Sequence, residues 1–218
     1  LSWIIIRTVL IIGICFLILY PLVVKTTTAF MEEQDMYDLT VTHIPKHVTL
    51  YNFAVAFELM DYLKSFTNSF MLSLLTSLLQ LASCTLVAYG FARYNFPGKN
   101  ILFSLVILVL VVPPQTLSIP IFINFRYFNP LNFFTGAKGG VNLLDTLWPY
   151  ALMSSTCMGL KNGLYIYIIR QVFRGMPKEL EESAFVDGAG HFKIFYQIML
   201  PGAVPIMITT FLFSFVWQ

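Results

Sequence analysis

Five long stretches of the chain carry almost no charge, and this feature restricts the possible folds more than any other. A helix needs about 20 apolar residues to cross the hydrocarbon core of a bilayer. Because lipid offers no partner to an unpaired backbone group, each such stretch must be helical. Lys161 is the only charged residue inside the stretches, which cover residues 8–24, 65–92, 100–125, 146–169 and 194–218. The sequence therefore predicts an all-α, polytopic helical membrane protein with five spans.

The overall composition agrees with a membrane protein. Of the 218 residues, 57% are hydrophobic and only 11% are charged, whereas soluble domains carry about 25% charged residues. A chain of this length cannot bury so much apolar surface in one globular core. The net charge of +2 is too small to indicate a nucleic-acid partner. Cys15, Cys84 and Cys157 lie inside apolar runs, which predicts small hydrophobic side chains and not disulfides or metal ligands.

The two ends of the chain lead to separate expectations. The run 8–24 follows Arg7 and could form the core of a secretory signal peptide, but it is longer than the usual 7–15 residues. A retained span is therefore favoured. The chain begins at Leu1 without a methionine and ends at Gln218 inside an apolar run. We therefore expect further sequence beyond these ends.

Basic residues near the ends of the runs predict the orientation in the membrane. The side with more cations on short flanking segments is expected to face the cytoplasm. One side would hold Arg7, Arg93, Lys99, Arg170, Arg174, Lys178 and Lys193. The other side would hold Lys25, Lys46, Lys64, Arg126 and Lys138, spread over longer loops that also carry acids. The N-terminus and segment 177–201 are thus predicted to be cytoplasmic.

The chain is expected to have two parts. Residues 1–64 would form the N-terminal span and a polar extracytoplasmic cap, in which an extended Ile44-Pro45 precedes a short helix near 52–63. Residues 65–218 would form the transmembrane core. Within the core, the glycine-containing segment 124–144 is typical of a flexible outer loop.

A polar stretch, residues 177–201, interrupts the apolar core and predicts a helix–turn–helix. Pro177 is suited to the first helical turn, and the acids that follow suit the positive end of the helix dipole. Asp187-Gly188 would reverse the chain before a second amphipathic helix that runs to Pro201. Such a shape suits docking into a groove of another protein. An interfacial helix on lipid is the alternative, although an anionic leaflet would favour a basic polar face.

The spacing within this stretch resembles the EAA loop of permease subunits of ATP-binding-cassette importers. The run Glu182-Ser183-Ala184, three residues, Gly188, nine residues, then Ile198-Met199-Leu200-Pro201 matches that motif at every spacing. Serine replaces the first alanine at Ser183, and Asp187-Gly188-Ala189 matches a common extension. The resemblance implies that this loop docks on a cytoplasmic ATPase. By carry-over, Glu182 would make a polar contact, Ala184 and Ala189 would permit close approach, and Gly188 would form the joint.

Further stretches are similar to the carbohydrate branch of these importers. They are IPKHVTLYNFAVAF at 44–57, AYGFARYNFPGKN at 88–100, VVPPQTLSIPIF at 111–122 and RQVFRGMPKELEE at 170–182. The resemblance implies a multi-pass subunit of a prokaryotic plasma membrane, with a sixth span after Gln218. It also implies three partners, namely a second permease subunit as heterodimer, cytoplasmic ATP-binding subunits and an extracytoplasmic solute-binding protein.

Four residues are candidates for lining the transport pathway. Pro113 and Pro114 should break the third span next to Gln115, and broken helices often line transport sites. Lys161 is charged within a span, which often marks a pathway, but Gly159 and Gly163 around it also allow helix packing or a local break. Gln80 and Ser83 could bond a solute or tie helices together, and the sequence leaves these alternatives open.

Catalysis and cofactors are not expected. Pro45 separates His43 from His47, so the pair does not share a helical face for a metal, and neighbouring Glu181 and Glu182 point in different directions. No cofactor motif is visible. Two rival functions remain: the same architecture importing a polyamine or glycerol phosphate, and an integral membrane enzyme acting on lipid.

Overall fold

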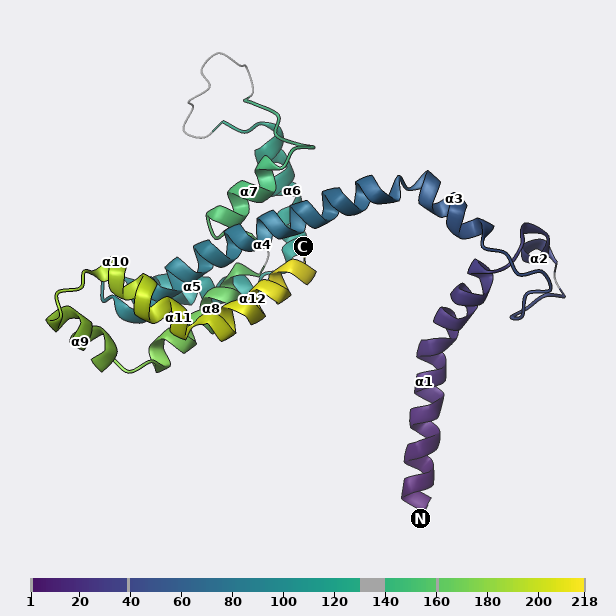
Figure 1. Ribbon diagram of the computed structural model, residues 1–218, viewed down its shortest axis with the longest axis horizontal. Coiled ribbons are helices and arrows are strands. Elements are labelled where there is room, and N and C mark those ends of the chain that lie inside the picture. The colour runs from purple at the N-terminus through teal and green to yellow at the C-terminus, as the bar shows by residue number, and fades with distance from the viewer. Residues whose placement is uncertain (1, 39, 130–139, 160, 218) are drawn as a thin grey trace. The chain divides into compact units, whose positions relative to one another are not determined.

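The computed structural model describes residues 2–38, 40–129, 140–159 and 161–217 (Figure 1). Helices make up nearly all of the regular structure in these ranges, and β-pairing is limited to two isolated bridges, Met31 with Val48 and Phe128 with Val141. The predicted all-α class is therefore confirmed. The chain divides into two compact units, Leu1–Asn68 and Ser69–Gln218. The predicted assignment of residues 1–64 and 65–218 to a cap-bearing part and a transmembrane core stays a prediction.

The first unit contains a long apolar helix, α1 (Ser2–Ala29). Residues Trp3–Ala29 are long and apolar enough to cross a membrane. The large apolar side chains along this helix are exposed, Leu17 by 73% and Val9 by 62%. Side chains of this kind are stable only when lipid or another protein covers them. The helix therefore matches the first predicted span.

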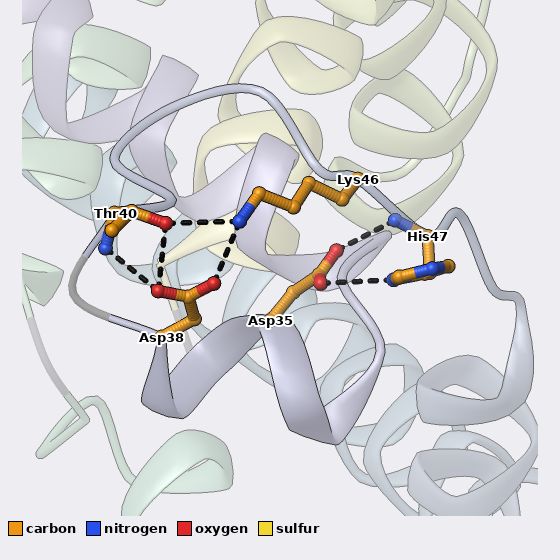
Figure 2. Close-up of polar contacts among 5 residues, drawn as sticks. All are labelled: Asp35, Asp38, Thr40, Lys46 and His47. Carbon is orange, nitrogen blue, oxygen red and sulfur yellow. Dashed lines mark hydrogen bonds and ion pairs between the residues drawn. The ribbon is translucent and has the colours of Figure 1, made fainter.

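A small polar substructure follows α1, built around α2 (Glu33–Tyr37). Asp35 is buried and accepts hydrogen bonds from the backbone N–H of His47 at 2.7 Å and from its ring at 3.1 Å (Figure 2). Asp38 accepts from Lys46 and from Thr40, each at 2.7 Å. Hydrogen bonds from the His47 backbone lower the pKa of Asp35 below its ordinary value of 3.8, because they favour the charged carboxylate.

The short helix predicted near 52–63 is present as α3 (Tyr51–Leu59), but it ends four residues earlier, and α4 (Tyr62–Arg93) begins at Tyr62. Asp61 between them has a φ of 43°, in the left-handed region that only short polar residues and glycine adopt easily. No glycine or proline lies at this break, so the sequence offered no helix-stop signal there.

The second unit is a helical bundle that begins within α4. Its remaining helices are α5 (Lys99–Val111), α6 (Pro114–Arg126), α7 (Trp148–Ser155), α8 (Asn162–Gly175), α9 (Glu179–Val186), α10 (His191–Ile194), a π-helix (Phe195–Met199), α11 (Leu200–Gly202) and α12 (Val204–Val216). Figure 1 shows α9 projecting from one end of this unit. The core contains Cys84, Ala88, Tyr165, Ile166, Ile169, Phe173, Ile194, Met199 and Ala203.

Three predicted spans differ from straight helices. The third is bent by 103° between α5 and α6, where Pro113 and Pro114 cannot continue the hydrogen-bond ladder of α5. The last is bent by 75° between α11 and α12. The residues predicted as the fourth fall in α7 and α8, which are separated near Lys161, and their assignment to one span stays a prediction. In the described ranges, length and composition support two spanning helices, or four if each bent pair is one span.

Close packing between helix backbones and hydrogen bonds between buried polar groups stabilise the bundle. A Cβ on Gly163 would lie 2.6 Å from the carbonyl oxygen of Val106, so α8 packs directly against the backbone of α5. Gln80 of α4 is fully buried, donates to the side chain of Asn162 on α8 and accepts from Ser214 on α12. Ser83 donates to the backbone oxygen of Ser154 on α7 at 2.6 Å. Polar side chains therefore join α4 to three other helices, as is common inside membranes.

Candidate functional site

The polar stretch folds as a short helix followed by a sharp reversal. Acidic Glu179, Glu181 and Glu182 occupy the first turn of α9, where the helix dipole favours them. At the other end, the N–H of Gly188 donates to Phe185 at 3.0 Å and the N–H of Ala189 donates to Ala184 at 2.9 Å. These two bonds form a Schellman cap.

Gly188 is required by the geometry of this reversal. Its φ of +80° lies in the left-handed region, and nothing lies within 4 Å of a Cβ built on it. The constraint is therefore conformational and does not come from crowding within this chain. The predicted break at Asp187-Gly188 agrees with these bounds. The predicted helix start at Pro177 is two residues early, because α9 begins at Glu179 after Lys178.

The loop is fixed to the bundle by polar contacts that sequence reasoning missed. Glu181 accepts a hydrogen bond from the hydroxyl of Tyr89 at 3.1 Å and lies 3.5 Å from the Nε of Arg93. Arg93 also donates to the backbone oxygen of Met176 at 2.9 Å. Both ionic side chains are shielded, since Arg93 is 6% and Glu181 is 15% exposed. No local pattern could indicate this pairing, because Glu181 lies 88 positions after Arg93 in the sequence.

The second half of the loop packs against aromatic residues of the bundle and of α9. The ring of Phe195 lies 4.7 Å from that of Tyr89, and the ring of His191 lies 4.8 Å from that of Phe185. The amphipathic helix predicted to run to Pro201 is divided, because α10 ends at Ile194 and a π-helix continues to Met199. Single π-turns are often found at functional sites.

The tip of the loop exposes several large apolar side chains beside acids. Val186 is 87% exposed, Phe192 79% and Tyr196 62%. Phe185 and Leu180 are also exposed, although less so. Scattered exposed apolar residues are ordinary, but a group on one anchored loop indicates a protein-binding or membrane-binding surface.

The structure separates the predicted loop residues into two groups. Exposed side chains are Glu182, Ser183, Asp187 and Pro201, together with Gly188. Ala184 is buried, and Ala189, Ile198 and Leu200 are half-buried. The buried group packs the loop on the core, while the exposed group remains accessible to a partner. Their roles in coupling stay predictions.

The candidate pathway residues lie on two parts of the bundle, and their role stays a prediction. Pro113, Pro114 and Gln115 are exposed at the bend between α5 and α6. Lys161 has a φ of 58° at the start of α8, and its ammonium lies 2.9 Å from the centre of the Trp217 ring. Within the described ranges, no cluster of three His, Cys, Asp or Glu side chains could hold a metal ion.

Comparison with known proteins identifies the family. The profile of the binding-protein-dependent transport system inner membrane component family matches residues 84–217, which include the whole loop. The chain belongs to this family. The resemblance seen in the sequence is thereby confirmed at the level of an inner-membrane permease, a transport component and not an enzyme.

Individual permeases support the same assignment. A probable ABC transporter permease protein of Pyrococcus horikoshii is 30% identical over 175 residues, covering 79% of this chain and 58% of that protein. An alpha-glucoside transport system permease protein of Rhizobium meliloti is 32% identical over 173 residues, 79% of this chain and 43% of that protein. The chain thus spans about half the length of the curated relatives it matches.

A solved structure has the same fold. It is a bacterial ABC transporter involved in the import of the acidic polysaccharide alginate, with a TM-score of 0.67 at 19% identity. The match covers 99% of this chain and 70% of that one. At this identity the likeness concerns the fold alone.

Proposed function

We propose that this permease forms half of the translocation pathway of an ATP-driven importer for a sugar or oligosaccharide. It couples transport to a separate ATPase through the loop 177–201. The observation that carries the proposal is the anchored α9, which holds Glu181 against Arg93 while Glu182 faces outward. A helix fixed at its base can transmit a displacement of its tip to the bundle.

The proposed topology has five spans in this chain and a sixth after Gln218. The bends at Pro113 and Ala203 and the break near Lys161 are accommodated within individual spans. Broken helices of this kind are common in transporters. The N-terminus and the coupling helix–turn–helix lie in the cytoplasm, where basic Arg93, Lys99 and Arg174 favour the inner side of the plasma membrane.

The loop has the chemistry of a docking helix. Val186 and Phe192 would enter a groove of the ATPase, and Glu182 would bond a polar group at its rim. The remaining residues of the motif have supporting roles. Ser183, Asp187, Gly188 and Pro201 contribute to the exposed surface, whereas Ala184, Ala189, Ile198 and Leu200 join it to the bundle.

Three protein partners follow from this proposal, in addition to the lipid bilayer. They are a second permease subunit that completes the pathway, cytoplasmic ATP-binding subunits, and an extracytoplasmic solute-binding protein. The pathway itself would include the bend at Pro113, Pro114 and Gln115, and Lys161 near the break. The named relative that transports alpha-glucosides supports a carbohydrate. Polyamine or glycerol phosphate import is the alternative, which direct binding to the solute-binding protein would distinguish.

The test is co-purification from the native membrane in mild detergent. The full-length tagged protein should retain an ATPase subunit, and Glu182→Gln should weaken that retention without changing expression. Glu179→Gln is the matched control, since Glu179 is an exposed acid of the same turn outside the motif. Loss of the ATPase in both variants, or in neither, would contradict the assigned role of Glu182. Absence of any ATPase with folded wild-type protein would refute the importer proposal.

A further inference from the structure

A basic cleft of about 420 Å³ lies beside the candidate coupling loop. It is formed where α4 ends, α5 begins and α8 ends. Its lining includes five cationic side chains and no acidic one, namely Arg93, Lys99, Arg170, Arg174 and Lys178. Five like charges around one cleft repel each other, so the arrangement favours an anion.

In the part of the chain that the structure describes, these cations make one ion pair, that of Arg93 with Glu181 at 3.5 Å. Arg170 donates to the backbone oxygen of Phe91 at 3.2 Å, and Lys99 donates to that of Tyr94 at 2.6 Å, which are both neutral partners. The two remaining cations, Arg174 and Lys178, make no side-chain hydrogen bond or ion pair within the described ranges. Most of the positive charge is therefore available to a ligand.

The start of α5 borders this cleft, and the N–H of Lys99 there donates to the backbone oxygen of Phe96 at 3.3 Å. Asn100 lines the cleft in the first turn of α5, next to Lys99. The first N–H groups of a helix have no partner within the helix and favour anions. Guanidinium groups add paired donors that match the oxygens of a phosphate. The donor set therefore fits a phosphate group better than a single carboxylate.

An apolar surface begins directly beside these donors. Ile101, Leu105 and Leu108 recur at helical spacing on α5, and they are exposed by 70%, 51% and 58%. A soluble phosphate has no apolar part that could bury this surface, whereas the acyl chains of a lipid would cover it. Basic pockets between helices at the membrane surface are known to hold anionic lipid headgroups.

We propose that this cleft binds the phosphodiester headgroup of an anionic phospholipid, whose acyl chains lie along α5. The phosphate is held by Lys99, Arg170 and Arg174, with the first turn of α5 beneath it. The site also touches the coupling loop, because Arg93 holds Glu181 and Lys178 immediately precedes α9. A bound lipid therefore stabilises the base of α9. This inference concerns lipid alone and stands or falls independently of the transported solute.

The experiment measures lipid retention by the full-length protein, in the assembly that is purified from membranes. The assembly is exchanged into nanodiscs of phosphatidylcholine with a small fraction of labelled phosphatidylglycerol, and close contact is read as energy transfer. Lys99→Gln with Arg174→Gln should weaken phosphatidylglycerol binding about 30-fold, taking the usual contribution of each interfacial cation. Neither side chain contacts another ionic group of the described chain, so folding should persist.

Arg7→Gln with Lys193→Gln is the matched control. It removes two exposed cations on the same predicted side of the membrane, outside the cleft. Unchanged binding in this control, together with the loss in the cleft variant, would support the site. Equal losses in both variants would reduce the effect to general electrostatics and overturn the proposal. Competition by millimolar inorganic phosphate as effective as that by phosphatidylglycerol would overturn it as well, since the cleft would then take free phosphate.

Discussion

Substitutions at Gly188 distinguish an effect on folding stability from an effect on the binding of a docking partner. The φ of +80° disfavours every other residue, whereas no atom lies within 4 Å of a Cβ at this position. Within this chain, Gly188→Ala and Gly188→Trp should therefore cost the same free energy of folding. That cost is roughly 1–2 kcal/mol, the usual penalty for an L-residue in the left-handed region. Gly188→Asn should cost less, because asparagine tolerates this conformation better.

A partner whose groove encloses the loop would bind the two variants with clearly different affinities. Alanine adds a single methyl group to the exposed surface, whereas tryptophan adds a bulky ring that a closely fitting groove cannot accept. We expect Gly188→Trp to reduce ATPase retention at least tenfold below Gly188→Ala, which corresponds to about 1.4 kcal/mol of binding.

The assay combines thermal unfolding of the purified protein with co-purification of the ATPase and solute-stimulated ATP hydrolysis. Alanine and tryptophan variants should unfold at similar temperatures and differ only in retention and stimulation. Equal retention by both variants would refute a close-fitting groove at Gly188. A much lower unfolding temperature for Gly188→Trp alone would refute the open geometry around this residue.

Three further changes test the packing of the loop, the bundle and the cap. Glu181→Gln should destabilise the protein by roughly 1–3 kcal/mol, because it leaves the shielded Arg93 without its acid; thermal unfolding measures this. Gly163→Ala should cost roughly 1–3 kcal/mol in the same assay, since the new Cβ would meet the Val106 oxygen at 2.6 Å. Asp35 has a lowered pKa, so its stabilising bonds persist above about pH 4 and are lost as pH falls through the folded pKa. Hydrogen exchange of the backbone amides around α2 should therefore accelerate below that range, and Asp35→Asn should reduce this pH dependence, while the share due to the lowered pKa of Asp38 remains.

Each change has a control in the same region. Glu182→Gln should leave the unfolding temperature unchanged, since Glu182 is exposed. Gly175→Ala should be tolerated, because nothing lies within 4 Å of its Cβ. Asp38→Asn should not remove the effect assigned to Asp35, whose own partner is His47. An equal loss of stability in a glycine or glutamate variant and its control, or a pH dependence in Asp35→Asn as large as in the wild type, would contradict the corresponding prediction.

The coupling loop shows which structural features could be predicted from local sequence. The spacing from Glu182 through Gly188 to Pro201 indicated the family, and the glycine indicated the reversal, because backbone conformation at such a residue is a local property. Pro113 and Pro114 likewise indicated the bend between α5 and α6, since proline removes a donor wherever it occurs. The helix break at Asp61 had no such signal, because no glycine or proline lies near it.

By itself the sequence determined the all-α membrane class, because long uncharged runs have few stable alternatives in lipid. It also determined the family, through spacings that a single stretch of chain carries. Only the tertiary structure joined Arg93 to Glu181, Gln80 to Asn162, and the basic residues of three helices into one cleft. These contacts link residues distant in sequence, and their geometry depends on how whole helices pack, which no local pattern specifies.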